Sequence, residues 1–366
     1  MPKGILPSLL AEFDPGLPLE RARTIPSSWY TAPEVYEAER RAVFGRTWQV
    51  VGRAEPVSRP GSFLTAEVAG EPVLVVRGDD GVLRAFFNVC RHRAAPVVTE
   101  PYGSATKLRC RYHGWTYDLA GNLRGTPEFD GVREFCKEDN GLAPVGAVAE
   151  WGPLVWVHLD PPREPLAEFL RPFASWVASR GGVGGLVWKA RRTYDLACNW
   201  KVYVDNYLDG GYHVNTVHPG LAGVLDYREY RTVCDGATVV QSAPLKPAEG
   251  ETGRTRTGDL ATYWWVYPNF MANLYAGVMD TNLVLPLGVD RCRVVFDFYF
   301  AAGADEGFVR DSVAVAEQVQ AEDVGICEEV QRGLGSRSYT TGRFSVKREN
   351  GGHYFHQLLG RALQQS

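Results

Sequence analysis

Short runs of β-branched and aromatic residues fill much of the first half of the chain. The runs are separated by Gly and Asp turns and lie at residues 63–68, 73–77, 83–89, 116–119 and 154–159. Short runs of this kind, bounded by turn residues, are typical of β-hairpins. The pattern therefore predicts a small all-β domain over residues 45–160.

After Pro161 and Pro162 the spacing of hydrophobic residues changes, and some segments have the periodicity of a helix while others have that of a strand. It predicts helices over 166–179 and 306–332, and an antiparallel sheet with strands at 260–275, 282–287 and 291–300. Alternation through Val294, Phe296, Phe298 and Phe300 is typical of a strand with one buried face. We therefore expect an α+β domain, built on an antiparallel sheet with helices, over residues 161–366.

The N-terminal region is expected to be an arm and a helix, over residues 1–44, that pack on the second domain. Residues 7–28 are rich in proline. Thr31 and Glu34 are spaced as in a capping box, which predicts the start of a helix. Gly45 is expected to end that helix after about Phe44.

Composition narrows the class of protein. Hydrophobic residues make up 45% of the 366 residues, enough for two cores, and 39 basic and 43 acidic residues give a net charge of −4. Without a basic run, neither nucleic acid nor an anionic membrane is favoured as a partner. We find no apolar stretch approaching the roughly 20 residues of a membrane span and no signal-peptide core, so we expect a cytoplasmic protein. The seven cysteines show no pairing pattern, and we predict no disulfide.

Two loops each offer one thiol and one imidazole. Cys90-Arg91-His92 is followed, after seventeen residues, by Cys110-Arg111-Tyr112-His113-Gly114-Trp115. A zinc finger usually groups its cysteines and its histidines separately, whereas a [2Fe–2S] centre with two histidines on one iron suits this interleaved supply. The spacing resembles a Rieske cluster site; a zinc site or two coincidental pairs are the alternatives. The resemblance implies that Cys90 and Cys110 hold the buried iron, and that His92 and His113 hold the outer one.

A second pattern contains His213 and His218. Non-haem Fe(II) oxygenases bind iron with two histidines and one carboxylate, which leaves open positions for dioxygen and substrate. Residues five apart diverge by about 140° on an ideal helix, so a helix must end between these histidines if they share one ion. Two ordinary histidines are the alternative interpretation for an isolated pair of this spacing.

Together with Asn199-Trp200-Lys201 and Asp205-Asn206-Tyr207, both patterns resemble the terminal oxygenase (α) subunit of Rieske non-haem iron oxygenases, over nearly the whole chain. The resemblance implies a [2Fe–2S] cluster and Fe(II) as cofactors. It implies Asp323 as the third iron ligand, with Glu322 as its nearest rival, and places Asn206 close to the iron. It also implies a small-molecule substrate, O2, a head-to-tail homotrimer and a separate NAD(P)H-dependent reductase or ferredoxin.

The resemblance also implies an acid three residues before the first iron histidine, where it would connect the iron to a neighbouring subunit's cluster. In this chain that position is Gly210. Asp209 and Asp205 are the candidate replacements, and water or backbone is a further alternative. Asp209 ranks first because Gly210 and Gly211 can adopt conformations barred to other residues.

For the substrate, residues 208–214, 267–271 and 279–287 look like the choline monooxygenase and glycine betaine demethylase branch. Aromatic faces bind quaternary ammonium ions by cation–π attraction. The candidate substrate-binding residues are Trp264, Tyr267, Phe270 and Tyr275, although each could equally belong to a core. An aromatic-ring dioxygenase or aromatic O- or N-demethylase would share every metal ligand. A non-catalytic Rieske electron carrier would need no second iron site.

Overall fold

The computed structural model describes residues 5–246 and 255–365. The chain divides into two compact units. The small unit is Phe44–Phe169, and the large unit combines Met1–Val43 with Leu170–Ser366. The first 43 residues therefore belong to the same unit as the C-terminal half of the chain.

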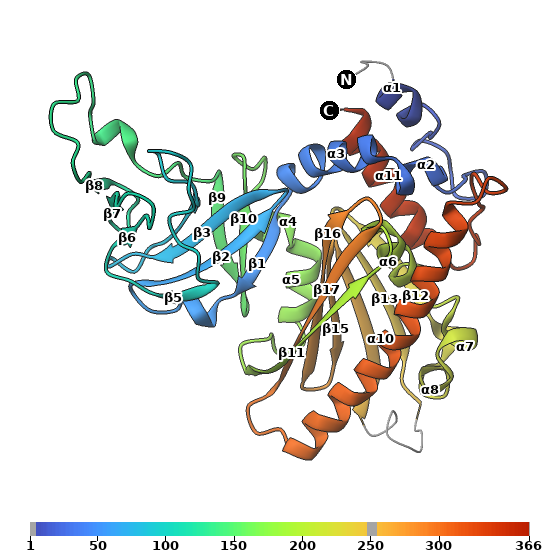
Figure 1. The fold of residues 1–366 in the computed structure, drawn as a ribbon. Coiled ribbons are helices and arrows are strands. Elements are labelled where there is room, and N and C mark those ends of the chain that lie inside the picture. Colours follow the sequence, from blue (N-terminus) through green and yellow to red (C-terminus); the bar gives the residue numbers. More distant parts are fainter. Residues whose placement is uncertain (1–4, 247–254, 366) are drawn as a thin grey trace. The chain divides into compact units, whose positions relative to one another are not determined.

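The small unit is built from short antiparallel strands (Figure 1). Its three sheets have the orders β1-β10-β9, β4-β3-β2-β5 and β6-β7-β8. The strands are β1 (Gln49–Arg53), β2 (Ser62–Val68), β3 (Glu71–Arg77), β4 (Leu83–Phe87), β5 (Tyr102–Ser104), β6 (Leu108–Arg109), β7 (Thr116–Tyr117), β8 (Leu123–Gly125), β9 (Ala147–Trp151) and β10 (Leu154–His158). The predicted all-β architecture is confirmed.

The large unit begins with three helices, α1 (Ile5–Leu10), α2 (Ser27–Thr31) and α3 (Pro33–Ala42). The predicted capping box is wrong. Thr31 lies in α2, where its hydroxyl donates to the Ser27 carbonyl at 3.0 Å. The N-cap of α3 is Ala32, without a side-chain cap, and Pro33 occupies the first turn, where its fixed φ favours a helix start.

Seven antiparallel strands form the sheet of the large unit, in the order β11-β17-β16-β15-β14-β13-β12. The strands are β11 (Leu186–Leu196), β12 (Arg231–Asp235), β13 (Thr238–Pro244), β14 (Leu260–Val266), β15 (Phe270–Tyr275), β16 (Val278–Gly288) and β17 (Arg291–Ala301). The predicted α+β class is confirmed. The single strand predicted at 260–275 is instead the hairpin β14–β15, whose turn contains Pro268, a residue that cannot donate to a ladder.

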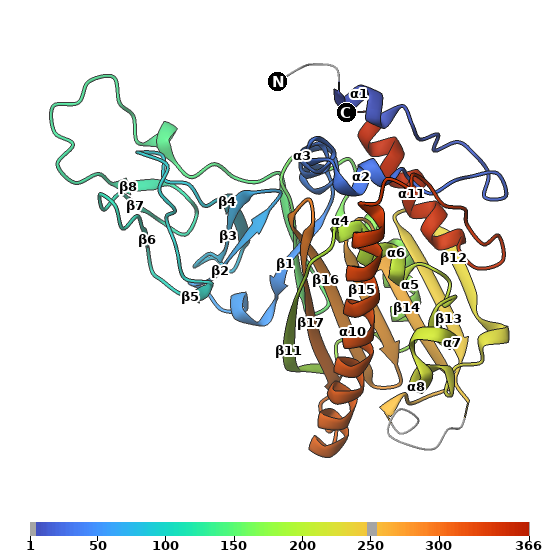
Figure 2. The same cartoon turned by 45° about the vertical axis from the view of Figure 1, so that its right-hand side comes forward.

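Helices cover both faces of this sheet. The helix predicted over 166–179 is two helices, α4 (Leu166–Phe169), at the end of the small unit, and α5 (Arg171–Ala178), which belongs to the large unit and packs on this sheet. Phe173 of α5 packs on Trp264 with ring centroids 5.3 Å apart. The opposite face contacts α6 (Trp200–Tyr207), α10 (Glu306–Leu334) and α11 (Asn350–Gln364). Figures 1 and 2 show α10 running along the sheet. Among the described residues, no helix is long and apolar enough to cross a membrane.

Candidate metal centres and active-site cavity

The two Cys/His loops of the small unit have the same backbone turn. In each loop the cysteine N–H donates to the carbonyl five residues later, and the N–H four residues later donates back to the cysteine carbonyl. These bonds join Cys90 to Ala95 and Ala94, and Cys110 to Trp115 and Gly114, at 2.8–3.0 Å. The fourth residue has a positive φ in both loops, 60° at Ala94 and 74° at Gly114. The loops therefore present their side chains in equivalent ways.

The thiols of these loops point inward and the imidazoles lie nearer the surface. Cys90 and Cys110 are buried, at 3% and 2% exposure, whereas His92 is half-buried and His113 is exposed. The two imidazole rings are 4.6 Å apart. Trp115 is buried and stacks on His92 with an interplanar angle of 8°. The two thiols thus lie in the protein interior, and the two imidazoles lie toward the surface.

This donor set fits a [2Fe–2S] cluster. His92 Nδ1 is buried but has no hydrogen-bond partner, as expected of an atom that ligates a metal. Burial raises the pKa of Cys90, although a hydrogen bond with Tyr117 opposes this, so a thiolate there requires a nearby cation. Cys90, Cys110, His92 and His113 together offer the two thiolates and two imidazoles of such a centre.

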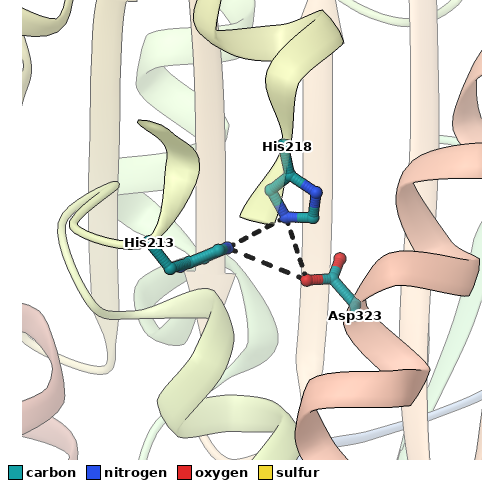
Figure 3. A group of neighbouring side chains, drawn as sticks. All are labelled: His213, His218 and Asp323. Atoms are coloured by element: carbon teal, nitrogen blue, oxygen red, sulfur yellow. Dashed lines mark hydrogen bonds and ion pairs between the residues drawn. The ribbon is translucent and has the colours of Figure 1, made fainter. Parts of the chain in front are cut away.

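In the large unit, His213, His218 and Asp323 point at one another (Figure 3). His218 Nε2 lies 3.0 Å from His213 Nε2 and 3.1 Å from Asp323 Oδ1. The third separation, between His213 Nε2 and Asp323 Oδ1, is 3.7 Å. Ligand atoms roughly 2.0–2.2 Å from one metal ion lie about 3–3.6 Å from one another. The three side chains fit a single iron ion.

Local backbone breaks bring the histidines together. After α6, Gly210 and Gly211 take φ values of 69° and 70°. His213 then begins the short helix α7 (Val214–Val217), which ends at His218. The His218 backbone leaves the helical region, with φ −116° and ψ 76°, before α8 (Pro219–Ala222). A helix end thus separates the two histidines, as their spacing requires, and α10 supplies Asp323.

A carboxylate orients each histidine. His213 Nδ1 lies 2.5 Å from Asp209 Oδ2, and His218 Nδ1 lies 2.6 Å from Glu322 Oε2. These contacts leave both Nε2 atoms facing Asp323, as in carboxylate–histidine–metal groups. Glu322, which the sequence offered as a rival ligand, therefore contacts the outer nitrogen of His218.

The site also favours a positive charge. Burial disfavours the protonated ring of His218, but Asp323 and Glu322 outweigh it and raise the pKa of this histidine. Asn206 Nδ2 donates to Asp323 Oδ1 at 2.7 Å and so holds the carboxylate in place. The same negative potential that stabilises an imidazolium would stabilise a bound cation.

The side chain of Asp205 forms its hydrogen bonds with residues outside the iron site. Tyr30 Oη donates to Asp205 Oδ2 at 2.5 Å, and His356 Nε2 lies 2.8 Å from Asp205 Oδ1. Both carboxylate oxygens thus bond to residues of α2 and α11. Asp209, by contrast, bonds to the His213 ring and to the backbone N–H groups of Tyr212 and His213.

A cavity of about 100 Å³ lies beside His213, His218 and Asp323. Its wall includes Tyr203, Asn206, Tyr207, Asp209, His213, His218, Tyr230, Arg256, Tyr263, Asn273, Asp280, Asn282, Phe296 and Asp323. The cavity lies between the helices and loops that supply the iron ligands and one face of the sheet.

None of the four aromatic residues proposed from the sequence lies on the wall of this cavity. Trp264 and Phe270 pack on α5, on the opposite face of the sheet, contrary to the prediction. Tyr267 packs on Trp265, 5.8 Å between centroids. Tyr275 lies one layer behind the wall, where its hydroxyl donates to the Tyr263 hydroxyl at 3.1 Å.

The wall residues that sequence reasoning missed include Tyr207, Tyr230, Arg256, Tyr263 and Asp280. Strand alternation offered a partial signal, because Tyr263 and Trp264 must face opposite sides of the sheet. Nothing in the sequence says which side holds the cavity. The pairing of Tyr263 with Asn273, and of Asn273 with Asp280, first shows that these residues share a face.

Comparison with known families agrees with both sites. Residues 47–136 match the Rieske [2Fe-2S] domain, and residues 185–365 match the catalytic domain of the ring hydroxylating alpha subunit. The two matched regions contain all four candidate cluster residues and all three candidate iron-site residues described above.

The chain is 42% identical to chloroplastic choline monooxygenase of Arabidopsis thaliana, over 97% of this chain and 86% of that protein. It is 29% identical to the carnitine monooxygenase oxygenase subunit of Escherichia coli (strain K12), over 94% and 95% of the two chains. The crystal structure of the quaternary ammonium Rieske monooxygenase CntA, with inhibitor MMV12, superposes with a TM-score of 0.86 at 29% identity, covering 98% of each chain. The chain therefore belongs to the Rieske non-haem iron oxygenases, which carry a [2Fe–2S] cluster and a mononuclear iron.

Proposed function

We propose that the protein is a monooxygenase of a quaternary ammonium compound such as choline or a betaine. The observation that carries this proposal is the cavity beside His213 and Asp323, whose wall contains several tyrosines and a buried carboxylate. Tyrosine faces attract a quaternary ammonium ion by roughly 0.5–2 kcal/mol per contact. The similarity to choline and carnitine monooxygenases supports the same substrate class.

Iron held by two histidines and one carboxylate would supply open positions for O2 and the power to hydroxylate a C–H bond. The chain's own residues prepare that centre. Asp209 and Glu322 orient the two imidazoles, and Asn206 fixes the carboxylate of Asp323. The buried wall of the cavity excludes water from the bound substrate, which limits side reactions.

We further propose that electrons reach the iron across a head-to-tail homotrimer, from the cluster of a neighbouring subunit. A solved relative is described as revealing inter-subunit electron transfer. Asp209 is the proposed connecting acid, because it already bonds the outer nitrogen of His213 while Asp205 is occupied by Tyr30 and His356. A separate NAD(P)H-dependent reductase or ferredoxin would supply the electrons.

A reducing compartment such as the cytoplasm suits this protein, because all seven cysteines are free thiols. Two of them are the proposed cluster ligands Cys90 and Cys110, whose thiolates must stay reduced to bind iron.

The test is a substrate panel with reconstituted protein and a surrogate reductase. Choline, glycine betaine, carnitine and aromatic acids are compared by NADH oxidation and by product detection. We expect product only from quaternary ammonium compounds. Product from aromatic acids alone would replace the proposal with an aromatic oxygenase.

A further inference from the structure

Three carboxylates line the cavity, and two of them are committed to the iron site. Asp209 bonds His213, and Asp323 converges with the two histidines. The third is Asp280, which lies in β16 on the sheet wall and is only 3% exposed. Asp280 is therefore the one cavity carboxylate, among the described residues, that the iron chemistry does not use.

The Asp280 carboxylate is only partly satisfied by the protein. Asn273 donates to its Oδ2 atom at 2.7 Å, and Asn282 approaches the same atom at 3.5 Å. Among the described residues, no hydrogen bond reaches Oδ1. A buried carboxylate costs several kcal/mol unless a charge or further donors compensate it.

Arg256 is the basic residue whose charge acts on Asp280, but the two side chains do not form an ion pair. The guanidinium lies over the Tyr275 ring at 4.7 Å, and no Arg256 salt bridge occurs among the described residues. Burial raises the pKa of Asp280 above its ordinary value, and Arg256 and the two asparagines only partly offset that increase. A cation beside the carboxylate would therefore stabilise its ionised form.

The tyrosines of the cavity cannot supply a negative charge themselves. Burial raises the pKa values of Tyr207, Tyr230 and Tyr263 well above the ordinary value, so these rings stay neutral. They offer π faces, which attract any compact cation or apolar group of the right size. A fixed charge is needed to distinguish a quaternary ammonium from its neutral carbon analogue.

We propose that Asp280 is the counter-ion of the substrate's ammonium group and the residue that makes the enzyme specific for charged substrates. This inference rests on the proposed function. It places the ammonium at the sheet wall, beside Asp280 and the tyrosine rings. The remainder of the substrate then extends toward His213, His218 and Asp323.

The experiment compares choline with 3,3-dimethylbutan-1-ol, in which carbon replaces the nitrogen, by calorimetric titration of the iron-loaded protein. The wild type is expected to bind choline at least about tenfold more tightly. Asp280→Asn should lower choline affinity about 10- to 100-fold and change the affinity for the neutral analogue less than about threefold. Asp280→Glu, which keeps the charge, should retain the preference. Asp290→Asn, at an exposed carboxylate beyond the same strand, is the matched control.

A double variant tests whether Asp280 recognises the substrate's charge or only neutralises the charge of Arg256. If Asp280 only neutralises Arg256, the combined Asp280→Asn and Arg256→Met protein should recover wild-type choline affinity. If our proposal is correct, the double variant still shows no preference for choline over the neutral analogue. Equal loss of both ligands in Asp280→Asn, or unchanged choline affinity, overturns the inference.

The same titration reports separately on the proposed function. A wild-type protein that binds neither choline nor glycine betaine would refute the quaternary ammonium substrate itself. If glycine betaine binds better than choline, 3,3-dimethylbutanoate, which keeps the carboxylate but lacks the ammonium charge, replaces the neutral alcohol in the same comparison.

Discussion

Lys201 Nζ lies 2.7 Å from Glu39 Oε1, and both side chains are fully buried. Glu39 belongs to α3 and Lys201 to α6, so this ion pair ties the N-terminal helices to the helix that precedes the iron histidines. Trp200 Nε1 donates to the second carboxylate oxygen of Glu39 at 2.8 Å. Burial raises the pKa of Glu39 and lowers that of Lys201, so each charge depends on the other.

Lys201→Met is expected to lower the free energy of unfolding by about 3–5 kcal/mol, because it leaves a buried carboxylate without its partner. Urea denaturation followed by tryptophan fluorescence measures this change. The control is Arg40→Ala, which removes a partly exposed pair with Glu37 and should cost about 1 kcal/mol. Equal costs for the two variants would contradict the importance of the buried pair.

Gly210→Ala is expected to abolish mononuclear iron binding and leave the cluster intact. A Cβ atom at Gly210 would lie 2.0 Å from the Arg348 carbonyl oxygen, on a backbone with φ 69°. The turn that carries Asp209 and His213 must then change. Iron analysis and the visible spectrum measure the two metal pools. Gly333→Ala, in α10 with no atom within 4 Å of the new Cβ, should leave both pools unchanged.

Cys110→Ser is expected to remove the cluster and its colour, because Cys110 is a proposed ligand of the buried iron. Asp323→Ala should keep the colour and lose only the mononuclear iron, together with turnover. Absorption spectra and iron content per chain distinguish the two. Bleaching of a folded Asp323→Ala protein would show that the two sites are not separate.

Asp209→Asn is expected to slow single-turnover reoxidation of the cluster by about 10- to 100-fold while both metals stay bound. The amide keeps the size of the side chain but loses the charge that pairs with His213. Asp205→Asn should affect this rate less, because its partners are Tyr30 and His356. Stopped-flow absorbance gives both rates. The reverse order of the two variants would favour Asp205 as the connecting acid.

Mixing Cys110→Ser and Asp323→Ala chains is expected to restore part of the activity. In a mixed trimer an intact cluster can lie beside an intact iron site on the neighbouring subunit. Turnover is measured after denaturation and joint refolding, and tagged subunits demonstrate that mixing occurred. No recovery in demonstrably mixed trimers would mean that electrons stay within one chain.

Most of the candidate metal ligands could be proposed from the sequence because they recur at short spacings, whereas Asp323 was proposed from the family resemblance. Cys90 and His92, or His213 and His218, lie within one loop, and few residue types ligate iron. Glu322 was not assigned as a histidine partner because its contact with His218 spans 104 residues. Only the packing of α10 against the histidine loop creates that contact.

The cavity wall could not be predicted in the same way. Trp264 and Tyr263 are adjacent, equally aromatic and both buried, yet only Tyr263 reaches the cavity. Which face of a strand meets the iron site depends on the helices that cover each face. Likewise, β11 and β12 lack the apolar alternation that revealed β17, because nearly all of their residues are partly or fully exposed.

The positive-φ turn at Gly210 and Gly211 has a consequence for recognising related enzymes. Asp209 meets the His213 ring across four residues of non-helical backbone, so the pitch of an α-helix does not set the distance along the chain between acid and histidine. In this chain the acid lies four residues before the histidine, one more than the three that the family resemblance implies. A sequence search that demands a fixed acid-to-histidine spacing would reject such a chain. A search anchored on the two histidines, with the acid allowed at either position before the turn, would retain it.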